Sequence, residues 1–73
     1  TGPGDRVADL EIARAEVEVA RGRVDEALAA ATRALARAST PGFTAERLRL
    51  SAGLVAMQKD PRWQALLAAH AGD

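Results

Sequence analysis

Residues 10–38, LEIARAEVEVARGRVDEALAAATRALARA, hold two apolar patterns with helical spacing, one on each side of Gly22. The first pattern, which runs from Leu10 to just past Gly22, forms two adjoining stripes, and this is typical of an α-helix with neighbours on more than one side. Apolar and polar residues do not alternate there, and Ala, Glu and Arg dominate, so the pattern argues against a strand. The first stripe consists of Leu10, Ala13, Val17, Ala20 and Val24, and the second of Ile12, Ala15 and Val19.

Gly22 predicts the end of this first helix, because glycine readily adopts the left-handed conformation found at helix C-termini. Asp25 is then expected to be the N-cap of a second helix. A connection this short makes the two helices antiparallel, and the many Ala residues of the second helix predict close packing between them. The apolar face of the second helix consists of Ala27, Leu28, Ala31, Ala34, Leu35 and Ala38.

A clear break follows at residues 39–42, where Pro and Gly disfavour a helix interior. We expect Thr44 to cap a third helix, with Phe43 and Leu48 packed across its start as a hydrophobic staple. This helix is predicted to continue through Gly53, where simple tolerance of the glycine is favoured over a close backbone contact. Its two apolar sets are Leu48, Ser51, Ala52 and Val55, and beside them Leu50, Leu54 and Met57.

A last helix is predicted from about Pro61 to Ala71, with Asp60 as its N-cap and proline at the first helical position, where a missing N–H donor costs nothing. Together these elements predict an all-α fold of about four short helices, arranged as two stacked antiparallel hairpins. Residues 1–4 are expected to be a linker or an expression remnant, and residues 5–73 a single helical domain. Within it, residues 5–38 form the first hairpin, and residues 44–71 form a second hairpin or a cap.

The composition narrows the functional classes. A chain of 73 residues has room for one domain, and without Cys it has neither disulfides nor thiolate metal sites. Ten basic and ten acidic residues give zero net charge, so no overall field favours nucleic acid. No apolar run approaches the roughly 20 residues that cross a bilayer, and the start shows no signal-peptide pattern. We therefore expect a cytoplasmic protein that contacts neither membrane nor nucleic acid directly.

A set of residues from the two predicted helices and the turn between them has a recognisable spacing: Ala15, Gly22, Asp25, Glu26, Ala27, Leu28, Ala34 and Leu35. On these residues, the stretch 8–41 resembles a tetratricopeptide repeat, a helical hairpin of about 34 residues that stacks into arrays. The family's aromatic positions in the first helix are occupied here by Glu11 and Glu18, and the large residue of the second helix by Ala31. The part after Pro41 resembles the end of the tetratricopeptide-type tails on actinobacterial helix-turn-helix transcriptional regulators, which implies a sensor or assembly domain of a larger bacterial protein.

Residues with catalytic potential are few. His70 is the sole His, and no hydroxyl is placed to work with it and a carboxylate. One His and scattered carboxylates lack the spacing of a metal site, and the six Gly residues form no phosphate-binding loop. The sequence therefore predicts no enzyme, no cofactor and no metal.

These patterns favour a protein–protein interaction or oligomerisation module. A repeat hairpin cannot bury both of its faces alone, so we expect Leu10, Ile12, Val17 and Val19 of the first helix to supply part of the contact. Trp63 has two interpretations, a core residue or a binding hot spot, of which the core is favoured.

An alternative is the regulatory domain of a transcriptional regulator, with a small apolar molecule or a peptide held between the hairpins near Trp63. The polar candidates for such a site are Thr44, Gln58, Gln64 and His70. Nucleic-acid binding is the least favoured function, because Glu and Asp are interspersed among the helical Arg residues, as on a solvated, ion-paired surface.

Overall fold

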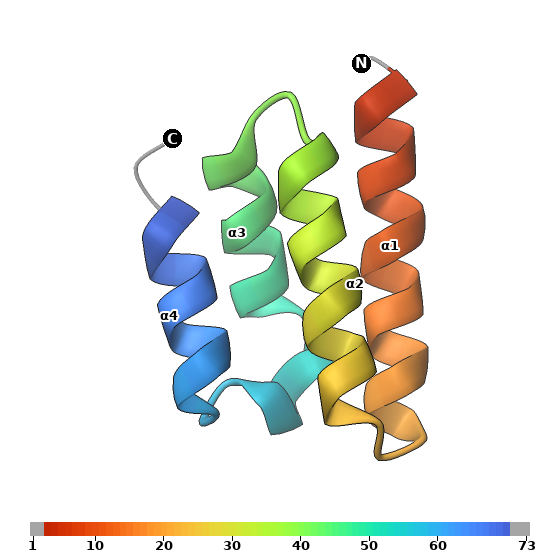
Figure 1. The fold of residues 1–73 in the computed structure, drawn as a ribbon, viewed down its shortest axis with the longest axis vertical. Coiled ribbons are helices and arrows are strands. Elements are labelled where there is room, and N and C mark those ends of the chain that lie inside the picture. Colours follow the sequence, from red (N-terminus) through yellow and green to blue (C-terminus); the bar gives the residue numbers. More distant parts are fainter. Residues whose placement is uncertain (1–2, 71–73) are drawn as a thin grey trace.

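The computed structural model describes residues 3–70, with side chains from Arg6 onward, and these residues form helices and no strand. This confirms the predicted all-α fold. Helices α1 to α4 lie side by side, roughly along the long axis of the molecule, with α1 at one edge and α4 at the other, and the short 3₁₀ helix lies across one end (Figure 1). In chain order they are α1 (Pro3–Ala20), α2 (Val24–Arg37), α3 (Pro41–Leu50), the 3₁₀ helix η1 (Ala52–Met57) and α4 (Pro61–His70).

The first two helices form the predicted antiparallel pair (Figure 1). Gly22 lies in the turn between them with φ of 75°, the left-handed conformation that its position predicted. The backbone N–H groups of Gly22 and Arg23 donate to the carbonyls of Val19 and Glu18, which closes the end of α1. The turn thus satisfies carbonyls that the end of a helix would otherwise leave open.

Small side chains fill the interface between α1 and α2. Ala15 of α1 is fully buried, and α2 buries the alanines of its predicted face while Leu28 and Ala38 pack partly buried beside them. Because an alanine extends only one carbon from the backbone, the two helices approach closely along their length. The buried residues of α2 are Ala27, Ala30, Ala31, Ala34 and Leu35, of which Ala30 was not in the predicted face.

The second half differs from the predicted continuous third helix. Helix α3 ends at Leu50, Ser51 is extended with ψ of 125°, and the chain resumes as the 3₁₀ helix η1. The amide of Gln58 stabilises this break, because its Nε2 donates to the carbonyls of Leu48 and Leu54 at 3.0 and 3.2 Å. One side chain thereby replaces hydrogen bonds that a continuous helix would have made.

Large side chains build the core of this half. Trp63 of α4 is fully buried, which agrees with its interpretation as a core residue. Its indole N–H donates to Oε1 of Gln58 at 3.3 Å. The same amide therefore joins α3, η1 and α4. The buried large side chains around it are Leu48, Leu54, Met57 and Leu67.

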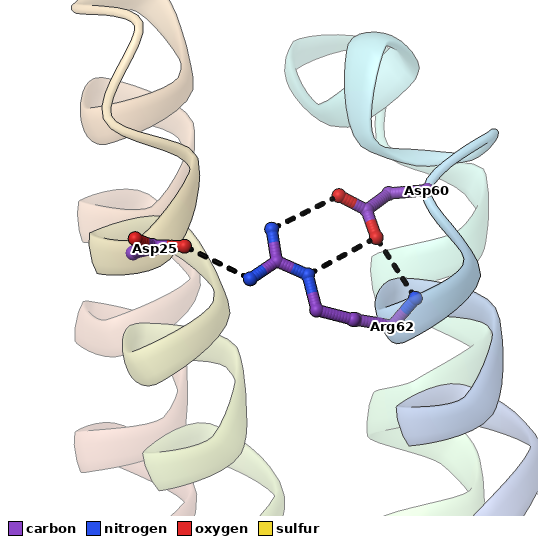
Figure 2. A network of polar contacts seen from close by, with 3 residues as sticks. All are labelled: Asp25, Asp60 and Arg62. Atoms are coloured by element: carbon purple, nitrogen blue, oxygen red, sulfur yellow. Dashed lines mark hydrogen bonds and ion pairs between the residues drawn. The ribbon is translucent and has the colours of Figure 1, made fainter.

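Helix α4 begins where the sequence predicted. The backbone N–H of Arg62 donates to Oδ1 of Asp60 at 2.8 Å, so Asp60 is the N-cap and Pro61 the first helical residue. Arg62 also reaches Asp25 in the first turn of α2 at 3.0 Å, as Figure 2 shows. Hydrogen bonds from Arg62 hold the pKa of the Asp60 carboxyl below its usual value.

Three predicted helix starts were wrong. Helix α1 begins at Pro3, inside the segment expected to be a linker, since proline suits a first helical turn. Helix α2 begins at Val24 and has no side-chain cap, so Asp25 lies within the first turn instead. Proline also starts α3 at Pro41, which places Thr44 inside the helix. Residues 1, 2 and 71–73 lie outside the described part of the chain.

Two packing predictions for the second half also failed. Phe43 is 61% exposed while Leu48 is buried, so they do not form a hydrophobic staple. Val55, placed on one face with Leu48, is exposed because the break at Ser51 rotates η1 relative to α3. A Cβ added to Gly53 would lie 3.0 Å from Cγ of Glu16, so the glycine permits a close side-chain approach rather than a backbone contact.

Candidate functional site

The outer face of α1 carries an exposed apolar row. Leu10 is 65% and Val17 49% exposed, and Ala13 and Ala20 between and beyond them are exposed as well. These four residues follow steps of three and four, so they line one side of the helix over about three turns. We call Leu10, Ala13, Val17 and Ala20 the outer seam.

The other apolar stripe of the same helix lies in the core. Ile12 is 7% exposed and Ala15 is fully buried, while Val19 is partly buried against the core. Helix α1 lies at the edge of the molecule (Figure 1). Because α2 packs on this buried stripe, the outer seam on the opposite side of α1 points away from α2. The two predicted stripes of α1 thus serve different roles, one within the fold and one on its surface.

The five residues predicted to make contacts with a partner are therefore divided by the structure. Leu10 and Val17 lie together on the outer seam. Ile12 and Trp63 are buried within the domain, because packing within the chain covers nearly all of both side chains. Val19 lies between these cases, partly buried at the edge of the core.

Charged side chains of opposite sign flank the outer seam. On the flank nearer α3, Asp9 forms an ion pair with Arg47, and Oε2 of Glu16 accepts a hydrogen bond from Ser51 at 2.5 Å. By helical spacing Arg14 and Arg21 follow the other flank. Among residues 6–70, Arg14 has no ion-pair partner, whereas Arg21 lies 4.0 Å from Glu18 with its side chain 62% exposed.

A hollow of about 520 Å³ continues the acidic flank towards α3. Leu50 lines it and is 67% exposed, because α3 ends there and η1 does not cover it. The sequence pattern placed Leu50 in one apolar set with Leu54 and Met57, but the structure buries those two and leaves Leu50 on the surface. The residues of this hollow are Asp9, Ile12, Ala13, Glu16, Arg47, Leu50 and Ser51.

A second concave site of about 340 Å³ lies between α3 and α4, with Trp63 among its lining residues. Two of the four polar candidates for a ligand site, Gln58 and Gln64, line it, and Thr44 and His70 do not. Both amides are engaged within the chain, since Nε2 of Gln64 donates to the carbonyl of Gln58 at 3.0 Å. The lining residues are Gly42, Ala45, Glu46, Arg49, Gln58, Trp63, Gln64, Leu67 and Ala68.

The Arg residues that form ion pairs lie on several different helices of the domain. Arg33 pairs with Glu11 between α2 and α1, and Arg49 pairs with Glu46 on α3, where the hydrogen bond lowers the pKa of Glu46. Within the described residues, no three His, Asp or Glu side chains gather as metal ligands would. No helix of that part is both long enough and apolar enough to cross a bilayer.

Comparison of the chain with protein-family models, curated proteins and solved structures found no match.

Proposed function

We propose that this domain is a non-catalytic module for protein–protein interaction or oligomerisation, and that the outer seam of α1 is its contact surface. The observation that carries the proposal is the exposed row of Leu10, Ala13, Val17 and Ala20 on an edge helix whose opposite side already packs on α2. In keeping with the resemblance to tetratricopeptide repeats, we take the domain to act within a larger bacterial protein.

The energetics of burial support this assignment. A buried Leu or Val side chain contributes roughly 1.5–3 kcal/mol relative to an exposed one, so Leu10 and Val17 stabilise the isolated fold little where they lie. Single exposed apolar residues are ordinary on protein surfaces. Here the apolar side chains recur on one side of one helix, and such a row is suited to receive a second helix.

A photoreactive amino acid at position 17 tests the proposal in the cells that naturally make the protein. We expect a cross-linked product that contains this chain and a second chain, whatever the second chain is, and we expect Leu10→Asp to abolish it. The matched control carries the photoreactive residue at Thr32, an exposed position on α2. Equal cross-linking at both positions, or none at position 17, would contradict the proposal.

The alternative, a regulatory site for a small molecule, is favoured by the concave site beside Trp63. Because the amides of Gln58 and Gln64 are already hydrogen-bonded, such a ligand would be largely apolar. Binding would change the emission of Trp63, the sole Trp, and raise the melting temperature. A set of apolar ligands that changes neither quantity would count against this function.

A further inference from the structure

We infer that the outer seam receives the same seam of a second copy of this chain, with the two α1 helices parallel and in register. This inference rests on the proposed function and names its partner. It is carried by two features of α1: the spacing of the exposed apolar residues and the signs of the charges on the two flanks.

The seam has the spacing of a short coiled coil. Leu10 and Val17 are seven residues apart, and Ala13 and Ala20 follow each of them by three, which is the repeat of core positions a and d. Side chains at these positions are exposed in the isolated chain. Since Ala at both d positions leaves the backbone accessible, two such helices can approach closely.

The flanks distinguish between possible partners. With Leu10 at position a, Asp9 and Glu16 occupy the g positions. Arg14 and Arg21 occupy the e positions. In a parallel pair, each g residue faces the e residue five positions later on the other helix, so Asp9 faces Arg14 of the other copy and Glu16 faces Arg21. All four contacts across the two-fold axis then join opposite charges.

Other arrangements bring like charges together. In an antiparallel pair of these helices, g faces g and e faces e, so acidic residues would meet acidic residues and Arg14 would meet Arg21. A uniformly acidic partner helix would be repelled by Asp9 and Glu16, and a uniformly basic one by the two Arg residues. Of the arrangements compared, a parallel second copy is the one whose flanks match on both sides.

The structure leaves these groups able to make such contacts. Arg47 binds Oδ1 of Asp9, and Ser51 binds Oε2 of Glu16, so each carboxylate keeps a second oxygen for a partner. These bonds also hold the two acidic side chains along their flank. Arg14 has no ion-pair partner among residues 6–70 and is available to a second chain.

Arg6 limits the seam at its N-terminal end. It precedes Ala13 by seven residues and therefore occupies the preceding d position, where a parallel pair would place two Arg side chains opposite each other. The apolar contact is thus restricted to two heptads, and we expect a weak dimer. Arg6→Leu extends the seam by one layer and is expected to strengthen association by roughly 3-fold or more.

The absence of Cys from the sequence gives a direct test of orientation. In a parallel, in-register pair, residue 13 of one copy lies beside residue 13 of the other. Ala13→Cys is therefore expected to form a disulfide-linked dimer under mild oxidation, while Ala36→Cys, at an exposed position on α2, remains largely monomeric. Equal yields from the two variants, or no dimer from Ala13→Cys, would overturn the inference.

Charge exchange tests the flanks, with the dissociation constant as the readout. Arg14→Glu with Arg21→Glu, and separately Asp9→Lys with Glu16→Lys, are each expected to weaken self-association roughly 10-fold or more. Mixing the two double variants restores opposite charges at every contact and is expected to restore dimers. Failure of the mixture to associate, with both variants folded by circular dichroism, would refute the flank assignment.

The two proposals can fail separately. If residue 17 cross-links to a different protein while Ala13→Cys does not form its dimer, the inference of a second copy is wrong and the interaction function stands. If neither experiment yields a linked product, both are wrong.

Discussion

The two halves of this domain hold their helices together by different means. Between α1 and α2, a row of alanines keeps two long helices in contact, and no single side chain dominates. In the second half, α3, η1 and α4 are short, and they are organised around Trp63 and the amide of Gln58. The stability of the first half should therefore be sensitive to added side-chain volume. That of the second half should be sensitive to the loss of Trp63 or of the Gln58 amide.

This difference also explains why an apolar row remains exposed on α1. Because α1 packs against α2, and to a smaller extent against η1, on its inner side, the outer seam on the opposite side is left uncovered by the rest of the domain. The large side chains that could have covered it are committed to the second half, where Leu48, Leu54 and Met57 pack with Trp63.

Removal of the Trp63 side chain should have the largest effect on the free energy of unfolding. Trp63→Ala deletes a fully buried side chain and is expected to cost about 3–5 kcal/mol, comparable to the whole stability of a domain this small. Chemical denaturation followed by circular dichroism measures it. Phe43→Ala, which truncates an exposed aromatic residue, is the matched control and should change stability little; a comparable loss in both variants would contradict the anchor role.

Added volume among the buried alanines of α2 should have the next largest effect on stability. Ala31 is fully buried in the core, so Ala31→Leu must displace its neighbours and is expected to cost about 1–3 kcal/mol. Ala36→Leu, on the exposed side of the same helix, should be close to neutral. If thermal unfolding shows that Ala31→Leu is tolerated as well as its control, the core around Ala31 is looser than the alanine packing indicates.

The amide of Gln58 should matter less than Trp63 but still measurably. Gln58→Met keeps the length of the side chain and leaves the indole N–H of Trp63 and the carbonyl of Leu48 without their partner, at an expected cost of about 1–2 kcal/mol. Gln64→Met, which removes one exposed hydrogen bond, serves as the control. An unchanged melting temperature for Gln58→Met would show that water replaces the amide at no cost.

The smallest expected effect is on folding stability at low pH, through the carboxylate of Asp60. Hydrogen bonds from Arg62 lower the pKa of Asp60 in the folded chain, so its contribution to stability is complete above pH of about 4 and is lost as the pH falls through the lower, folded value. Asp60→Asn should therefore lose less stability than the wild type between pH 5 and pH 2, by roughly a few degrees of melting temperature. Parallel melting curves for both proteins across that range would contradict this role of the carboxylate.

The sequence predicted the first half better than the second for identifiable reasons. Gly22 and the spacing of the apolar residues locate the first hairpin, and Asp60 with Pro61 locates the start of α4. The break at Ser51 escaped prediction because neither Pro nor Gly occupies that position, and the bonds that stabilise it come from Gln58, seven residues later.

The candidate site was predicted only in part, for a related reason. Helical spacing identified both stripes of α1, but spacing within one helix cannot reveal which stripe a neighbouring helix covers. That choice depends on where α2 packs, so Leu10 and Val17 could be separated from Ile12 only in the folded chain. Leu50 was missed because its exposure follows from the unpredicted break.

The most direct test of the central claim, that the outer seam associates with a second copy, is the solution mass of wild type and Val17→Asp by light scattering over a concentration series. We expect the wild-type mass to rise from one chain towards two. For Val17→Asp we expect a single chain throughout, with the melting temperature that the wild type has at concentrations where it is monomeric, because Val17 lies outside the core. Identical mass curves for the two proteins would contradict the account.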